Sequence, residues 1–176
     1  MLRRHNRRLA GVTLAEMLIV VAILSVAAAI AIPQASSVTP YAADATAAEV
    51  ARAIRFAQRE AIRTGTVHRV SVDPATQALH VFGLSSSGNT TSTHPVDKRE
   101  YIILFGNNAM LHGTIVSSVF KYDKSVTTNY ISFTPDGSPG HMDQSDPLKE
   151  DGRITLRHGN AERVIRVAPS TGRVTF

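Results

Sequence analysis

Residues 11–32 read GVTLAEMLIVVAILSVAAAIAI, and this stretch decides how the rest of the chain is organised. From Val12 to Ile32 the only ionisable side chain is that of Glu16. As an α-helix rising about 1.5 Å per residue, the run would be roughly 30 Å long, which is about the thickness of the hydrocarbon core of a bilayer. The run therefore predicts a helix that crosses a membrane.

The residues on either side of this run predict its orientation. Pro33 follows it, and four arginines precede it: Arg3, Arg4, Arg7 and Arg8. Basic residues ahead of an apolar helix are held on the cytoplasmic side, so we expect the rest of the chain to lie outside. Glu16 needs a partner, because a carboxylate near the start of a membrane helix costs on the order of 2–3 kcal/mol or more when it is unpaired.

Three interpretations of the segment compete. The first is a plain membrane anchor with Glu16 at the interface. The second is a secretory signal peptide, for which the basic start and the small residues Ala29 and Ala31, in the pattern Ala29-Ile30-Ala31, are suitable. Against it, the apolar region is too long for a signal peptide, and a charge inside it is unusual. The third interpretation is based on resemblance to a known family.

The basic leader ending in Gly11, followed by Thr13, Leu14 and Glu16, closely resembles the N-terminus of type IV prepilins. That family is cut by a membrane aspartyl prepilin peptidase directly after the glycine. The resemblance implies cleavage between Gly11 and Val12 and N-methylation of the new amine on Val12. It also implies that Glu16 acts in filament assembly by pairing with the N-terminal ammonium of a neighbouring subunit, which would offset its burial.

This chain departs from the commonest prepilin pattern at two positions. Val12 stands where Phe is usual, and Ala15 stands where a larger aliphatic residue is usual. Both changes are small, and Gly11 and Glu16 are in place.

Length and charge say little about partners. The 176 residues allow one domain beside the anchor, and the absence of cysteine excludes a disulfide framework. The formal net charge is +5, but without the four leader arginines 15 basic side chains face 14 acidic ones. The processed chain would be nearly neutral, so its global charge predicts no class of ligand.

Residues 42–64 are rich in alanine and predict an amphipathic helix that continues the first one. Its apolar residues recur at helical spacing, at Val50, Ile54, Ala57 and Ala61, with Ala47, Ala53 and Ile62 near the same face. We expect a kink or short break near Pro33 and Pro40, and a helix end at Gly65.

Beyond Gly65 the apolar period changes to two, which predicts strands. The predicted strands are residues 66–73, 77–84, 100–105, 114–122, 130–134, 153–157, 163–168 and a last segment, 171–176. Residues 85–93 predict a polar loop, and residues 100–105, apolar on both faces, predict a central strand. A hairpin is expected to turn at 158–160. The fold class is α+β, with a long N-terminal helix, membrane-embedded in its first half, packed on an antiparallel β-sandwich-like domain.

Further motifs narrow the resemblance to the minor pseudopilin H (GspH/FimT) family. Residues 51–65 look like its first helix, residues 131–138 resemble its strand and turn before the last hairpin, and residues 171–174 resemble its ending. Residues 85–128 carry no recognisable motif. The resemblance implies a two-sheet β-sandwich and a minor subunit of a type II secretion pseudopilus or a type IV pilus. Some members of the family take up DNA.

We therefore divide the sequence into four parts: a prepilin leader at 1–11, a transmembrane and assembly helix at 12–32, its kinked continuation at 33–65, and a C-terminal periplasmic β domain at 66–176. The expected location is the bacterial inner membrane, with a single pass and incorporation into a filament after processing. The expected partners are other pseudopilins or pilins, the prepilin peptidase and the inner membrane.

The sequence predicts no enzyme, no cofactor and no metal. Its seven histidines are scattered without metal-ligand spacing, and it contains no nucleophile elbow or phosphate-binding glycine loop. Five acids crowd one region and would suit Ca²⁺, but they do not fit the EF-hand spacing: Asp136, Asp143, Asp146, Glu150 and Asp151. We expect an ordinary solvated acidic loop.

A basic C-terminal segment raises the alternative function, DNA binding for DNA uptake. Residues 153–176 hold Arg153, Arg157, Arg163, Arg166 and Arg173 against the single acid Glu162. Arg153 and Arg157 share one strand face, so together with Arg173 they would suit contacts with DNA phosphates. DNA-uptake members of the family resemble the chain at Gly172 and Arg173 but carry another arginine where Thr175 stands here. Otherwise these arginines pair with the acidic loop at 143–151 or face a partner subunit.

Overall fold

The computed structural model describes residues 12–35, 38–85, 88–106, 111–124, 126–141 and 146–176. The chain divides into two compact units, Met1–Val38 and Thr39–Phe176. Each unit is described by itself.

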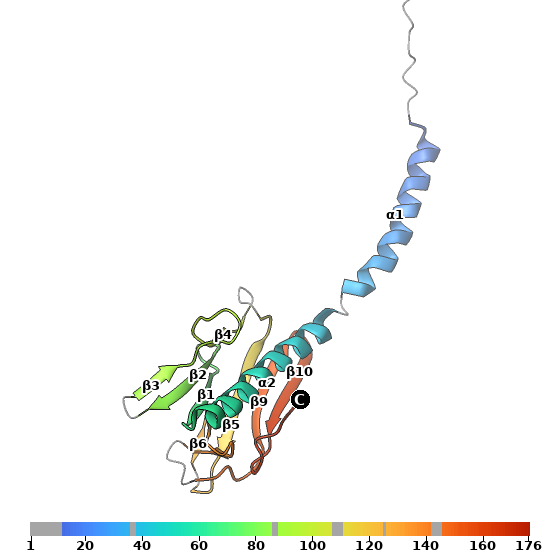
Figure 1. The fold of residues 1–176 in the computed structure, drawn as a ribbon. Coiled ribbons are helices and arrows are strands. Elements are labelled where there is room, and N and C mark those ends of the chain that lie inside the picture. Colours follow the sequence, from blue (N-terminus) through green and yellow to red (C-terminus); the bar gives the residue numbers. More distant parts are fainter. Residues whose placement is uncertain (1–11, 36–37, 86–87, 107–110, 125, 142–145) are drawn as a thin grey trace, which may run out of the picture. The chain divides into compact units, whose positions relative to one another are not determined.

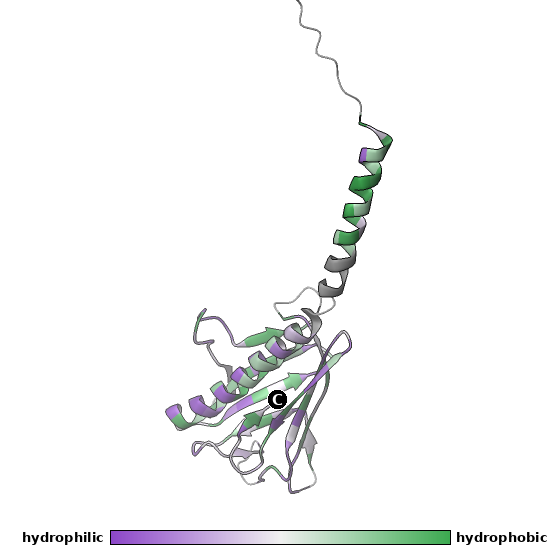
Figure 2. Ribbon diagram, turned by 90° about the vertical axis from the view of Figure 1, so that its right-hand side faces the viewer, coloured by the Kyte–Doolittle hydropathy of each residue, from purple (hydrophilic) through white to green (hydrophobic). Residues whose placement is uncertain are grey.

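The first unit contains one helix, α1 (Leu14–Ala35). Figure 2 colours most of the described residues of this helix as hydrophobic. The side chains from Val12 to Ala28 are all exposed within this chain. Pro33 lies two residues before the end of α1, and residues 36–37 lie outside the described residues. Among the helices that the structure describes, none has the combined length and apolar character of a membrane span.

The second unit begins with α2 (Val38–Thr64), which confirms the predicted amphipathic helix and starts it four residues earlier. Pro40 lies in its first turn, where a missing N–H costs nothing because that group has no partner inside the helix. Gly65 adopts φ +65° and donates its N–H to the carbonyl of Ala61 at 3.0 Å. This geometry confirms the predicted helix end.

Two antiparallel sheets follow (Figure 1). The first sheet has the order β3-β2-β1-β7-β8, with β4 also paired to β2; its strands are β1 (His68–Asp73), β2 (Ala78–Ser85), β3 (Gly88–Thr91), β4 (Ile102–Leu104), β7 (Tyr130–Phe133) and β8 (Pro139–Gly140). The second has the order β11-β10-β9-β5-β6; its strands are β5 (Thr114–Lys121), β6 (Thr127–Thr128), β9 (Gly152–His158), β10 (Ala161–Val167) and β11 (Val174–Thr175). The hairpin β9–β10 turns between His158 and Ala161 as predicted.

The core lies between α2 and the sheets, and this arrangement confirms the α+β class. Val50, Ile54, Ala57 and Ala61 of α2 are fully buried and belong to one cluster with residues of both sheets. The alanines matter because a side chain of one methyl group lets the helix backbone approach the strands closely.

Three local predictions are wrong. Strand β4 is not central: Ile103 is buried, but Ile102 and Leu104 are 36% and 56% exposed, because nothing in the described chain covers that face. Residues 85–93 are not only loop, because β3 forms there by backbone pairing with β2, which needs no buried side chain. Ile62 does not join the core and is 55% exposed, since it lies about 100° around α2 from Ala61.

Candidate assembly and interaction surfaces

Thr13 and Glu16 cap the start of α1 reciprocally. The N–H of Glu16 donates to Thr13 Oγ1 at 3.2 Å, and the N–H of Thr13 donates to Glu16 Oε2 at 3.4 Å. This arrangement is a capping box, in which two helix-end donors that have no partner inside the helix are satisfied by side chains. The carboxylate of Glu16 therefore has a local hydrogen-bond partner, but the structure gives it no opposite charge among the described residues.

The apolar side chain of Val12 and those of α1 from Leu14 to Val26 are not covered by any described residue. The large ones between Val12 and Val26 are each between 48% and 78% exposed. Burying one side chain of this kind is worth about 1.5–3 kcal/mol, so ten of them in water would be very unfavourable. This helix requires an apolar surrounding, from lipid or from other helices.

A different set of motif residues holds α2 on the sheets. The side-chain amide of Gln58 donates to the carbonyl oxygens of Gly137, at 2.9 Å, and Thr171, at 2.8 Å. Gly172 packs so closely that a Cβ there would lie 2.7 Å from Gln58 Nε2 and 2.9 Å from Phe133 Cε1. The two motifs at 131–138 and 171–174 therefore meet at one helical residue, and their part in the fold is to dock the helix.

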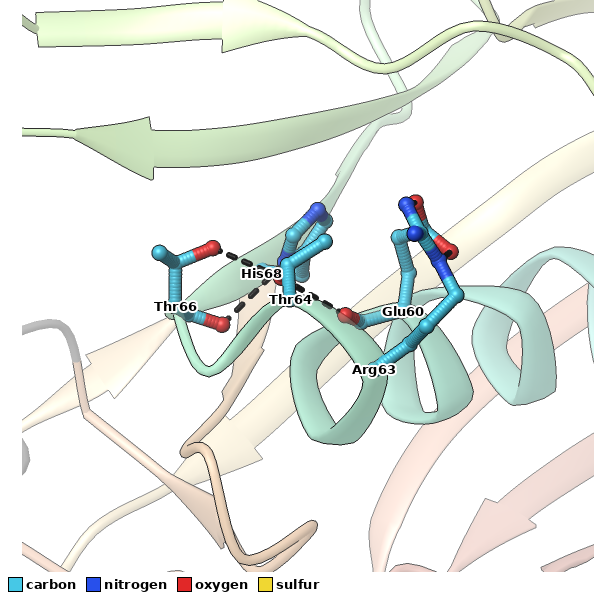
Figure 3. Close-up of polar contacts among 5 residues, drawn as sticks. All are labelled: Glu60, Arg63, Thr64, Thr66 and His68. Carbon is cyan, nitrogen blue, oxygen red and sulfur yellow. Dashed lines mark hydrogen bonds and ion pairs between the residues drawn. The ribbon is translucent and has the colours of Figure 1, made fainter.

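The end of α2 is tied to β1 by a chain of polar contacts (Figure 3). Arg63 pairs with Glu60, and this hydrogen bond holds the pKa of Glu60 below its ordinary value. Thr64 Oγ1 donates to the Glu60 carbonyl at 2.7 Å and lies 2.8 Å from Thr66 Oγ1. His68 Nδ1 lies 3.2 Å from the Thr66 carbonyl. These contacts order the turn at which the helix gives way to the first strand.

The acids that would suit Ca²⁺ are engaged separately. Hydrogen bonds from the hydroxyls of Thr134 and Ser138 lower the pKa of Asp136, and Asp146 is buried and accepts the N–H of Lys124 at 3.0 Å. Glu150 pairs with Lys121 at 2.8 Å, Asp151 is exposed, and Asp143 lies outside the described residues. Within the described part of the chain, no three His, Asp or Glu side chains are grouped so that they could hold a metal ion.

The five C-terminal arginines do not form one patch. Arg157 pairs with Glu162 at 3.1 Å, and Arg163 pairs with Asp44 of α2. For these two, the expected pairing with the loop at 143–151 is wrong. Arg153 and Arg166 lie directly opposite each other on β9 and β10, and both are exposed. Arg173 is exposed beyond β10, next to the Val174 carbonyl that accepts a hydrogen bond from Arg55 of α2.

Arg69 is a buried cation that was not predicted from the sequence. Arg69 of β1 is only 8% exposed, and its guanidinium lies 4.6 Å from the centre of the Tyr130 ring. Its Nε and Nη2 atoms, and the hydroxyl of its cross-strand neighbour Ser132, are buried without a hydrogen-bond partner in the part of the chain that the structure describes. Burial lowers the pKa of this guanidinium. Because side chains alternate along a strand, Arg69 belongs to the face of β1 opposite to that of the buried Val70. Alternation alone does not show that both faces of β1 are covered.

A second set of candidate residues, the exposed arginines of α2, was not singled out from the sequence. Arg52, Arg55, Arg59 and Arg63 are all exposed on α2 at spacings of three or four residues. Such spacing places side chains along one side of a helix. The periodicity used to find the buried face predicts this second face as well.

The helix α1, the amphipathic helix α2 and the two antiparallel sheets together define a pilin-like subunit. The family model of type II transport protein GspH matches residues 46–171, and that of the prokaryotic N-terminal methylation motif matches residues 6–32. The chain belongs to the GspH family.

The fold is similar to that of a solved minor pseudopilin. The minor pseudopilin EPSH of the type II secretion system of Vibrio cholerae is 12% identical, with a TM-score of 0.53 over 77% of this chain and 95% of that one. The type IV minor pilin FimU of Pseudomonas aeruginosa is 17% identical, with a TM-score of 0.43 over 76% and 87%. No curated protein matches the sequence significantly.

Membership of this family defines the general role. The chain is a minor pseudopilin or minor pilin of a type II secretion system or a type IV pilus, and it assembles with other pilins in a membrane-anchored filament. Its family is one of structural pilin subunits.

Proposed function

We propose that the chain is cut between Gly11 and Val12 by a prepilin peptidase, methylated on Val12, and recruited from the bacterial inner membrane into the filament through Glu16. In this proposal α1 crosses the inner membrane once before assembly, and the domain at 39–176 lies in the periplasm. The observation that carries the proposal is the position of Glu16, a carboxylate at the start of a helix whose described apolar side chains are uncovered.

The contacts of Glu16 separate two roles that the residue can have. The capping box uses only a side-chain oxygen as acceptor, which glutamine supplies as well as glutamate. Pairing with the ammonium of a neighbouring subunit needs the negative charge, because an uncompensated charge in an apolar bundle costs several kcal/mol. A neutral isostere therefore keeps the first role and removes the second.

The experiment compares Glu16→Gln and Glu16→Ala in the full-length chain expressed in its own host. We expect both variants to be inserted and processed as wild type, and both to recover far less of the other filament subunits on affinity purification. Thr13→Val, which removes the cap but keeps the charge, should retain most of that recovery. If Glu16→Gln behaves as wild type while Glu16→Ala fails, Glu16 acts as a helix cap and the proposed pairing is wrong.

Binding of DNA through Arg153, Arg157 and Arg173 has less support. Arg157 is already paired with Glu162, and Arg173 lies on a different segment from the β9–β10 hairpin. The geometry favours the role of structural subunit.

A further inference from the structure

The exposed side of α2 carries a row of four arginines whose side chains lie outside the core. We call Arg52, Arg55, Arg59 and Arg63 the arginine stripe. All four are exposed, and the core is built from other residues of the same helix, Val50, Ile54, Ala57 and Ala61 among them. The stripe is therefore a helix face that the domain leaves uncovered.

The two ends of the stripe are neutralised within the helix and its middle is not. Arg52 pairs with Glu49, and Arg63 pairs with Glu60, each three residues away. Residues 50–59 between these acids contain three arginines and no acid. Arg55 donates from Nη2 to the Val174 carbonyl at 2.9 Å, and Arg59 forms no ion pair with any described residue.

The backbone of the C-terminal segment lies beside the middle of the stripe. Arg55 bonds to the Val174 carbonyl and Gln58 bonds to the Thr171 carbonyl, so residues 171–174 lie along this part of α2. Arg173 is in that segment and is exposed. The concentration of positive charge around Arg55 and Arg59 comes from the helix itself, since residues 50–59 contain three arginines and no acid.

This concentration has an energetic cost, and no ion pair with a described residue offsets it at Arg55 or Arg59. Like charges three or four residues apart destabilise a helix by about 0.2–0.5 kcal/mol for each pair. The helix dipole favours cations only in the last turn, which contains Arg63 but neither Arg55 nor Arg59. Solubility alone would be served equally well by alternating charges. The central arginines are better explained by a partner outside the chain.

The neighbours of the stripe indicate a protein partner. Tyr41 is 75% exposed near the start of α2, and Ile62 is 55% exposed near its end. Arginine and tyrosine are enriched at protein interfaces, whereas the exposed apolar residues would add nothing to phosphate contacts.

We propose that the arginine stripe docks on an acidic surface of an adjacent subunit in the same filament. The inference rests on the filament role described above and adds the surface and its charge. Arg55 and Arg59 supply the central contacts, each as a charge-assisted hydrogen bond to a carboxylate, and Tyr41 and Ile62 pack at the two ends.

The test uses the tagged full-length chain in its own host, solubilised in mild detergent. Arg59→Glu is the informative variant, since Arg59 makes no ion pair inside the fold and its replacement spares the domain. Arg153→Glu is the matched control, because it makes the same change of charge at an exposed residue on another surface. The measurement is the amount of other filament subunits recovered with the chain, by quantitative mass spectrometry, with and without nuclease.

We expect Arg59→Glu to lower that recovery roughly tenfold, because placing a like charge at an interface costs more than the 1.4 kcal/mol that corresponds to a factor of ten. Arg153→Glu and nuclease treatment should leave it unchanged, and wild-type recovery should fall with rising salt. Undiminished recovery with Arg59→Glu, an equal loss with Arg153→Glu, or loss after nuclease overturns the proposal.

The outcomes also separate this proposal from the one on which it rests. If Glu16→Gln abolishes recovery and Arg59→Glu does not, the filament role holds and the stripe is not its docking surface. If wild type recovers no filament subunit at all, the filament role fails and the docking proposal fails with it.

Discussion

The side-chain amide of Gln58 on α2 donates to the carbonyl oxygen of Gly137, 79 residues further along the chain, at 2.9 Å. The same nitrogen also donates to the Thr171 carbonyl, so one helical residue connects α2 to the turn after β7 and to the turn before β11. These two turns lie in the segments 131–138 and 171–174 that resemble the family. Their resemblance to the family is therefore explained by packing rather than by a ligand.

Gln58→Leu keeps the bulk of the side chain but removes both hydrogen bonds. The part-buried Gly137 carbonyl and the exposed Thr171 carbonyl lose their donor, and we expect the free energy of unfolding to fall by about 1–3 kcal/mol, mostly from the Gly137 bond. Urea denaturation of the full-length chain in detergent measures it. Arg52→Leu, on the exposed side of the same helix, is the control and should change stability by no more than about 0.5 kcal/mol. Equal stabilities of the two variants would contradict the docking role of Gln58.

Gly172 and Gly65 form a matched pair, since both have φ +65°. A Cβ at Gly65 meets nothing within 4 Å, whereas one at Gly172 collides with Gln58 and Phe133. Gly65→Ala should therefore cost only the backbone strain of about 1–2 kcal/mol. Gly172→Ala should cost a further 1–3 kcal/mol or so from overpacking. The same denaturation experiment gives the difference, and equal losses would show that the contact at Gly172 relaxes freely.

The ion pair between Asp44 and Arg163 should make stability depend on acid pH. The hydrogen bond from Arg163 lowers the pKa of the Asp44 carboxyl below its ordinary value of 3.8. The contribution is therefore complete above pH 3.8 and is lost as the pH falls through the lower value of the folded state. In Arg163→Gln, NMR titration should show the pKa of Asp44 returning towards 3.8. An unchanged titration would mean that the pair does not persist in solution.

Arg69→Met should be neutral or stabilising. The contact with Tyr130 is worth about 2 kcal/mol at most, while each unpaired buried donor group costs about 1–3 kcal/mol, and Arg69 has two such nitrogen atoms. Thermal or urea unfolding measures the balance, with the exposed Arg153→Met as control. A loss of more than about 2 kcal/mol would show that Arg69 has a partner beyond the tyrosine.

Processing can be tested at Gly11, which lies outside the described residues. The peptidase of the resembled family requires a small residue before the cleaved bond, so Gly11→Val should leave an uncut precursor in the membrane. N-terminal sequencing of the mature wild-type protein should begin at Val12. A start at Ile32, as a signal peptidase would produce, or an intact Met1 would contradict the proposed site.

The sequence by itself determined the features that depend on neighbours in the chain. The helical period of residues 42–64, the stop at Gly65 and the hairpin at 158–160 follow from local backbone preferences and from alternating apolar residues. The methylation motif at 6–32 is likewise a local pattern, readable without a fold.

Only the tertiary structure decided which faces are covered and which charges are free. Arg163 finds Asp44 across 119 residues of chain, and this contact removes it from the expected basic patch. Strand β4 has the composition of a central strand but lies at the side of β2, with Leu104 uncovered. The apolar residues of a strand indicate which of its faces could be buried if other segments packed on them. Which partners are present depends on contacts between distant segments, and these form only when the whole chain packs.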